Sequence, residues 1–132
     1  MVTLLFSLAF GALQLSCREP EDNSPIGTWE IQSYDDGTHS RGISQLLTIW
    51  TTNELKTCDA TGVTNVLGSI VRVDTTVTPF EVDWCHEGAT NYGIFEISGD
   101  TMRLVLGGAG LPRLTEFRGS SNSWLRVLRR TQ

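Results

Sequence analysis

The amino-acid sequence predicts an all-β domain, an antiparallel up-and-down barrel of about eight strands. Three observations favour this class. Short runs of alternating apolar and polar residues recur roughly every 8–12 residues, turn-forming residues separate them, and no segment has the apolar periodicity of a helix. The length of 132 residues is enough for one domain with one core.

Successive strands are expected to pair as antiparallel neighbours, because the turns between them are short enough for hairpins. Closure of the sheet would remove exposed strand edges. The expected strands, in order, cover residues 29–34, 45–50, 54–58, 67–73, 79–84, 92–97, 102–106, 113–118 and 124–128.

Turn residues set the strand boundaries in the first half of the chain. Asp35-Asp36-Gly37 is a strong turn signal after the first strand. Thr51-Thr52-Asn53 separates the second strand from the third. Residues 59–65 are expected to form a loop, and the run 67–73 that follows is rich in β-branched residues.

Alternation defines the strands in the second half. Phe80, Val82 and Trp84 fall on one face of their strand because side chains alternate with a period of two. The turn Ser98-Gly99-Asp100 separates the next two strands, and residues 107–112 are expected to form a glycine-rich loop.

Residues 1–17 are expected to be a lipoprotein-type signal peptide. Val2–Leu15 is largely apolar but shorter than the ~20 residues that span a bilayer. A small residue then precedes Cys17, the expected lipidation site; an ordinary cleaved signal peptide is the alternative. Residues 18–25 form a short polar linker, and the barrel domain covers 26–130. The sequence therefore predicts an exported protein, lipid-anchored in the cell envelope or free in the periplasm.

The remaining cysteines form a candidate disulfide. If Cys17 carries lipid, Cys58 and Cys85 are left as a pair in an oxidising compartment. A bond between them would close a loop of about 27 residues and contribute ~3 kcal/mol. Two buried free thiols are the alternative.

The charge distribution argues against nucleic acid as a partner. The net charge is −5, and residues 19–100 carry fourteen acidic side chains against three basic ones. Residues 101–132 carry six arginines against Glu116. We expect these arginines to point outward from the last strands and pair with acidic neighbours; a basic patch is the alternative. Contact with a membrane is expected only through the lipid anchor.

Gly27-Thr28-Trp29, after Pro25, is typical of the first strand of lipocalin-like barrels. With the other matching segments, it makes the chain resemble the Planctomycetes lipocalin-like domain family, whose members are small and mostly exported. The resemblance covers about residues 26–130. The matching segments are Gly27–Trp29, Asp36–Gly37, Pro79–Asp83, Gly93–Ile97, Gly99–Leu104, Arg113–Phe117 and Val127–Arg129.

The resemblance implies a lipocalin-like barrel with a closed base. In lipocalins the tryptophan of this motif packs at the closed end, often under an arginine from the last strand. The resemblance therefore assigns Gly27, Trp29 and Arg129, or Arg126 in its place, to the barrel base. Such a cation–π contact contributes about 1–2 kcal/mol when it is desolvated.

Catalytic and metal sites are not expected, and neither is a cofactor. Asp83, Cys85 and Glu87 would share one face of a strand, with His86 on the other, so they do not converge on one ion. No nucleophile and base occur in a recognisable local context. Gly107–Gly110 lacks the strand, helix and lysine that surround a phosphate-binding loop. We therefore expect that the protein is not an enzyme.

Binding of a small apolar or amphipathic ligand inside the barrel is the first functional hypothesis. An envelope-anchored structural or interaction module with a filled barrel is an alternative, with residues 60–65 and 107–112 as its working loops. An inhibitor of an exported hydrolase is another. No protein partner follows from the sequence. The candidates for lining a ligand cavity are Trp50, Phe80, Trp84, Tyr92, Phe95 and Phe117.

Overall fold

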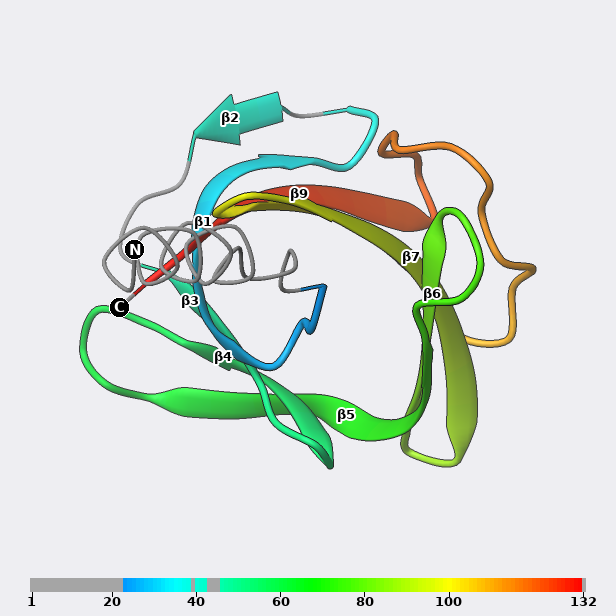
Figure 1. Cartoon of the computed structure of the whole chain (residues 1–132), viewed down its shortest axis with the longest axis horizontal. Coiled ribbons are helices and arrows are strands. Elements are labelled where there is room, and N and C mark those ends of the chain that lie inside the picture. The colour runs from blue at the N-terminus through cyan, green and yellow to red at the C-terminus, as the bar shows by residue number, and fades with distance from the viewer. Residues whose placement is uncertain (1–22, 39, 43–45, 132) are drawn as a thin grey trace, which may run out of the picture.

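The computed structural model describes residues 23–38, 40–42 and 46–131. Within these residues the protein has nine strands and no helix (Figure 1). The expected lipidation site, Cys17, and the rest of the expected signal peptide lie outside the described residues. The strands are β1 (Gly27–Asp35), β2 (Ser40–Gly42), β3 (Leu47–Trp50), β4 (Glu54–Cys58), β5 (Thr64–Asp74), β6 (Phe80–His86), β7 (Ala89–Ser98), β8 (Thr101–Gly107) and β9 (Ser123–Arg130).

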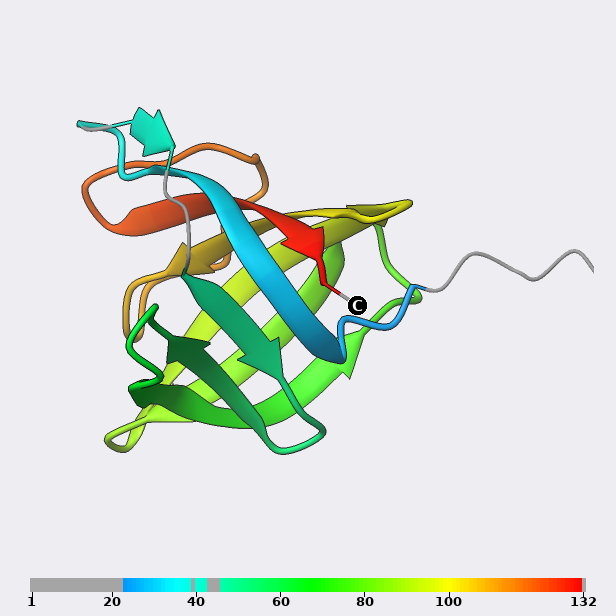
Figure 2. The same ribbon diagram turned by 90° about the vertical axis from the view of Figure 1, so that its left-hand side faces the viewer.

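Eight of these nine strands close into an antiparallel barrel, which confirms the fold class expected from the sequence. The order runs β1-β3-β4-β5-β6-β7-β8-β9, and β9 pairs back onto β1 (Figures 1 and 2). The short β2 pairs with Ser33–Asp35 of β1, whereas β3 pairs with Gly27–Glu30. Two separate strands therefore share one edge of β1.

The barrel has two distinct ends. The Gly27 end carries the start of β1, the turn 51–53, the turn 99–100 and the C-terminal end of β9; it faces right in Figure 2. The opposite end carries the loop 59–63 and the β6–β7 turn. In that turn Glu87 and Gly88 both have positive φ, which matches the twist of a two-residue hairpin.

Buried side chains fill the barrel between its two ends. Phe95 is fully buried, with ring centroids 5.4 Å from Trp50 and 5.3 Å from Phe80. As expected, Val82 and Trp84 share the inward face of β6 with Phe80. The buried cluster consists of Trp29, Ile31, Trp50, Leu55, Val82, Trp84, Phe95, Met102, Leu104, Leu106 and Leu128.

The connection between β8 and β9, residues 108–122, is here called the strap. It runs outside β6 and β7 (orange in Figure 1). The expected strand over 113–118 is wrong, because β8 pairs directly with β9 and leaves no free edge for another strand. The strap is held by side chains instead: Arg113 Nη1 donates to the Gly93 carbonyl at 3.0 Å, and Nη2 lies 2.5 Å from Asp83 Oδ1.

The strap accounts for two apolar side chains that are buried outside the barrel. Ile94 and Val105 oppose each other across β7 and β8, on the outward face relative to their neighbours Phe95 and Leu104. They are 1% and 0% exposed. The barrel wall is therefore covered by a second layer on this side.

Candidate functional site

Two cavities lie at opposite ends of the barrel, on either side of the buried cluster. The N-terminal cavity, at the Gly27 end, has a volume of about 480 Å³. The Arg126 cavity, at the opposite end, has a volume of about 350 Å³ and is lined by β1, β5, β6, β7, β8 and β9. Of the described residues, none lines both cavities. The Arg126 cavity is lined by Tyr34, Val66, Leu67, Trp84, His86, Asn91, Leu106, Trp124 and Arg126.

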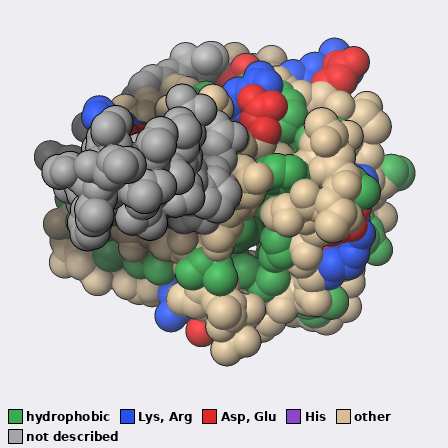
Figure 3. Space-filling view, in the orientation of Figure 1, with side chains coloured by type: hydrophobic (Ala, Val, Ile, Leu, Met, Phe, Trp, Pro, Cys, Tyr) green, Lys and Arg blue, Asp and Glu red, His purple; other side chains and the backbone are tan. Residues whose placement is uncertain are grey.

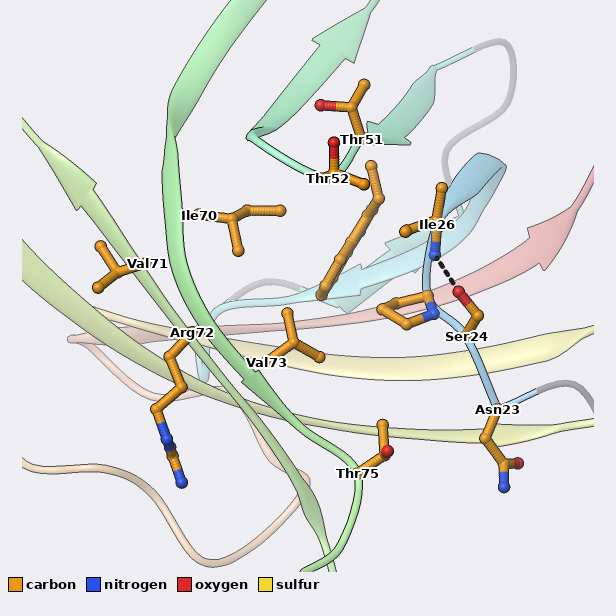
Figure 4. A pocket seen from close by; sticks show the side chains of 12 residues that line it. Asn23, Ser24, Ile26, Thr51, Thr52, Ile70, Val71, Arg72, Val73 and Thr75 are labelled. Carbon is orange, nitrogen blue, oxygen red and sulfur yellow. Dashed lines mark hydrogen bonds between the residues drawn. The ribbon is translucent and has the colours of Figure 1, made fainter.

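The N-terminal cavity lies between residues 23–26 and β5. Figure 3 shows this end of the molecule, with hydrophobic side chains around a central hollow. In Figure 4, Ile70 and Val73 lie on one side of β5, and Arg72 extends from the other side. Arg72 is paired there with Asp74 and Glu81, at 2.8 and 3.0 Å. The walls of this cavity are therefore mainly apolar.

The Arg126 cavity acquires its arginine from the alternation of β9. Trp124 opposes Leu106, Arg126 opposes Leu104, and Leu128 opposes Met102. Residues directly opposite each other in a sheet share a face. Leu104, opposite Arg126, and Leu128, two residues farther along β9, both belong to the buried cluster. Arg126 shares their face and therefore points into the barrel. The expectation that the arginines of the last strands all point outward is wrong for Arg126.

Arg126 carries buried polar atoms that have no partner. Its Nε and Nη1 are both buried without a hydrogen bond. Desolvation by burial lowers the pKa of Arg126, while Tyr34 opposes this shift. Buried polar groups in proteins are almost always hydrogen-bonded, because leaving one unpaired costs about 1–3 kcal/mol and a charged group costs more. The cavity therefore contains an unsatisfied cationic donor.

Asn91 adds an unsatisfied acceptor to the same cavity. Its Nδ2 donates to the Gly107 carbonyl at 3.3 Å, whereas its buried Oδ1 has no partner. Asn91 opposes Trp84 across β6 and β7. The rest of the lining is aromatic or aliphatic apart from His86 and the hydroxyl of Tyr34. An apolar cavity with a few fixed polar groups is the usual composition of a small-molecule site.

The expected lining residues are distributed over three places. Trp84 lines the Arg126 cavity and Trp50 lines the N-terminal cavity. Phe95 belongs to the buried cluster and Phe80 packs against it; neither lines a cavity. These two aromatic side chains fill the barrel.

The interpretation of Tyr92 and Phe117 as interior residues is wrong. Tyr92 opposes Asp83 on the outer face, and the Arg113 guanidinium lies 5.1 Å from its ring centroid. Phe117 belongs to the strap, where Arg103 lies 4.4 Å from its ring. Both aromatic rings therefore join the strap to the outside of the barrel.

The base contact of Trp29 is made by Arg130, so the assignment of Arg129 or Arg126 to this role is wrong. The Arg130 guanidinium lies 4.2 Å from the Trp29 ring centroid, and Trp29 Nε1 donates to the Pro25 carbonyl at 2.9 Å. Gly27 gives Arg130 room, because a Cβ atom at this position would lie 3.3 Å from Arg130 Nη1. Arg129 is exposed on the outer face.

Cys58 and Cys85 are both free thiols, so the expected disulfide is wrong. Cys85 and Glu54 both oppose Ser69, on either side of β5. Cys58 lies four residues farther along β4, roughly 13 Å at ~3.3 Å per residue, and two strand spacings of ~4.8 Å away. The ~7 Å limit between bonded Cα atoms is exceeded. Both thiols are half-buried, which also differs from the buried alternative.

Among residues 23–38, 40–42 and 46–131, no group of three or more His, Cys, Asp or Glu side chains is arranged to hold a metal ion. In the same part of the chain, no helix has the length and apolar character needed to cross a bilayer.

No protein-family model, curated protein or solved structure matches the chain. The case for function therefore depends on the geometry of the two cavities.

Proposed function

We propose that the protein binds one small amphipathic molecule in the Arg126 cavity. The observation that carries this proposal is the pair of buried, unpartnered nitrogens of Arg126 in a cavity lined mainly by apolar side chains. Its volume of about 350 Å³ lies in the range of ~300–1,000 Å³ that is usual for ligand sites. The proposal assigns binding to the protein and no catalysis.

The lining divides the expected binding energy between two kinds of contact. Trp84, Trp124, Leu67 and Leu106 offer apolar surface, which contributes about 25 cal/mol per Å² removed from water. Arg126 and Asn91 offer one donor group and one acceptor, which would orient a polar ligand and discriminate against analogues that lack the matching groups.

Two valines on β5 provide a test with a built-in control. Val66, 47% exposed, borders the Arg126 cavity, and Val73, 39% exposed, borders the N-terminal cavity. Fluorescence titration with the neutral probe N-phenyl-1-naphthylamine should give saturable binding. We expect Val66→Trp to weaken it about tenfold or more by filling the cavity, and Val73→Trp to leave it unchanged. Absence of saturable binding, or an effect of Val73→Trp alone, would contradict the proposal.

We also propose, from the sequence, that the protein is exported and anchored by lipid at Cys17, and that it is related to the Planctomycetes lipocalin-like domains. The Cys17→Ser variant should then move from the membrane fraction to the soluble fraction of its host. An unchanged distribution between the two fractions would argue against the anchor.

A protein-interaction role is the second candidate, and exposed valines support it. Val63, Val71 and Val77 are 54%, 65% and 37% exposed on and beside β5. Val71, on β5 itself, is the most exposed of the three, and an exposed apolar side chain is available for contact with a partner. Cross-linking in the envelope should capture a partner that is lost in a Val71→Asp variant; capture that is insensitive to this change would count against the surface.

A further inference from the structure

Resting on the proposed function, we infer that the ligand of the Arg126 cavity carries an anionic oxygen group, such as a carboxylate or sulfonate, that pairs with Arg126. Nε and Nη1 are donors on different edges of one guanidinium, and each can donate a charge-assisted hydrogen bond to an anionic oxygen beside it. Both are buried and unpartnered. The rest of the ligand would be an apolar body that contacts Trp84 and Trp124.

Among the residues that the structure describes, no acidic side chain lines the cavity to neutralise Arg126. None of its nine lining residues is Asp or Glu. Tyr34, opposite Arg126 across β1 and β9, directs its hydroxyl to Asp36 Oδ2 at 3.3 Å. On the other side, Arg126 opposes the apolar Leu104. The pairing partner for this cation is therefore expected from the ligand.

Other arginines in the described residues show the contrast. Arg72 pairs with three carboxylates, Arg103 pairs with Glu96, and Arg113 pairs with Asp83 and Glu81. All three lie on the outer face of the barrel or on the strap. Arg126, in contrast, points into the barrel and has no carboxylate partner among the described residues. Carboxylates are nevertheless abundant in the sequence. This placement separates Arg126 from the arginines that stabilise the wall.

The environment of Arg126 makes an anion a strong partner. Burial lowers the pKa of its guanidinium because the charged form loses hydration. An arriving oxyanion replaces that hydration with a charge-assisted hydrogen bond in a poorly solvated place, where electrostatic attraction is stronger than in bulk water. A neutral ligand of the same shape gains only the apolar contacts.

Two fluorescent probes that differ by one group test the inference. 1-Anilinonaphthalene-8-sulfonate has the scaffold of N-phenyl-1-naphthylamine with a sulfonate added. The wild-type protein should bind the sulfonate about 10- to 100-fold more tightly than the neutral probe, as expected for a hydrogen-bonded charge. Arg126→Met should remove this preference and retain binding of the neutral probe.

Arg129→Met is the matched control, because it removes one charge from the outer face of the same strand. It should leave the preference intact. If both probes bind with equal affinity and Arg126→Met changes neither, the inference is overturned while the proposed binding function stands. If neither probe binds saturably, both fail. If Arg126→Met does not fold, displacement of the neutral probe from wild-type protein by octanesulfonate against octanol decides: equal potency overturns the inference.

Discussion

The guanidinium of Arg130 stacks on Trp29 and also ties the start of the domain to its end. It lies 4.2 Å from the Trp29 ring centroid, and its nitrogens donate to the carbonyls of Ile26 and Ser24 at 3.4 and 3.1 Å. One side chain near the C-terminal end of β9 therefore holds both the first strand and the segment before it.

Removal of this side chain should destabilise the barrel. Arg130→Met loses the cation–π contact and two hydrogen bonds to carbonyl oxygens, so we expect a loss of about 1–2 kcal/mol in the free energy of unfolding. Arg129→Met, one residue earlier and exposed, should change it by less than about 0.5 kcal/mol. Urea denaturation of both variants measures the difference; equal effects would contradict the stacking role.

Removal of Arg126 should have the opposite sign. Arg126→Met replaces a half-buried guanidinium, whose Nε and Nη1 are buried and unpaired, with an apolar side chain of similar length, so we expect stability to rise by about 1–3 kcal/mol. Thermal and urea unfolding without ligand measure this change, again with Arg129→Met as the control. A clear loss of stability would show that Arg126 has a structural partner in the folded protein.

Asp74 predicts a specific acid dependence. The Thr76 hydroxyl and backbone N–H both donate to Asp74 Oδ1, at 2.6 and 2.8 Å, and the hydroxyl is the main reason that the pKa of Asp74 is lowered. A lowered folded-state pKa stabilises the protein above the unfolded value of about 3.9 and loses this effect as the pH falls through the folded value. The stability gap between wild type and Asp74→Asn should therefore shrink below about pH 4. A gap independent of pH between 7 and 2 would contradict this account.

Gly119 is expected to be intolerant of a side chain. A Cβ atom there would lie 2.1 Å from the Asp35 carbonyl oxygen and 2.8 Å from the Gly37 nitrogen. Because these are backbone atoms, Gly119→Ala must displace the strap from the end of β1, and we expect a loss of about 2 kcal/mol or more. The exposed Ser121→Ala is the control. Hydrogen exchange should quicken along the strap and β9 in the first variant alone.

The fold was predictable from sequence because strand alternation and turn residues are local signals. Trp84 and Leu104 face inward as their alternation predicts. The strap was not predictable: residues 113–118 have an extended, partly apolar sequence, and pairing of β8 with β9 leaves them no edge to join. β2 is only three residues long and carries no alternating signal.

The candidate site was only partly predictable. The aromatic residues could not be divided between core and cavity, because both environments select the same side chains. Arg126 did leave a signal: Trp124, Arg126 and Leu128 share one face of their strand. A charged residue between two large apolar residues of the same face marks an inward charge. The same alternation places Arg130 on that face and Arg129 on the other, so the contact of Arg130 with Trp29 also had a signal in the sequence.

The buried cluster between the two cavities has a thermodynamic consequence. Within the described part of the chain, no side chain lines both cavities, and the buried cluster lies between them. Distant sites with no shared partners behave additively to within about 0.5 kcal/mol. The effects of a change at Arg126 and a change at Val73 should therefore sum in a double-mutant cycle. Substitutions that change the cavity at one end of this small barrel would then leave the cavity at the other end unchanged.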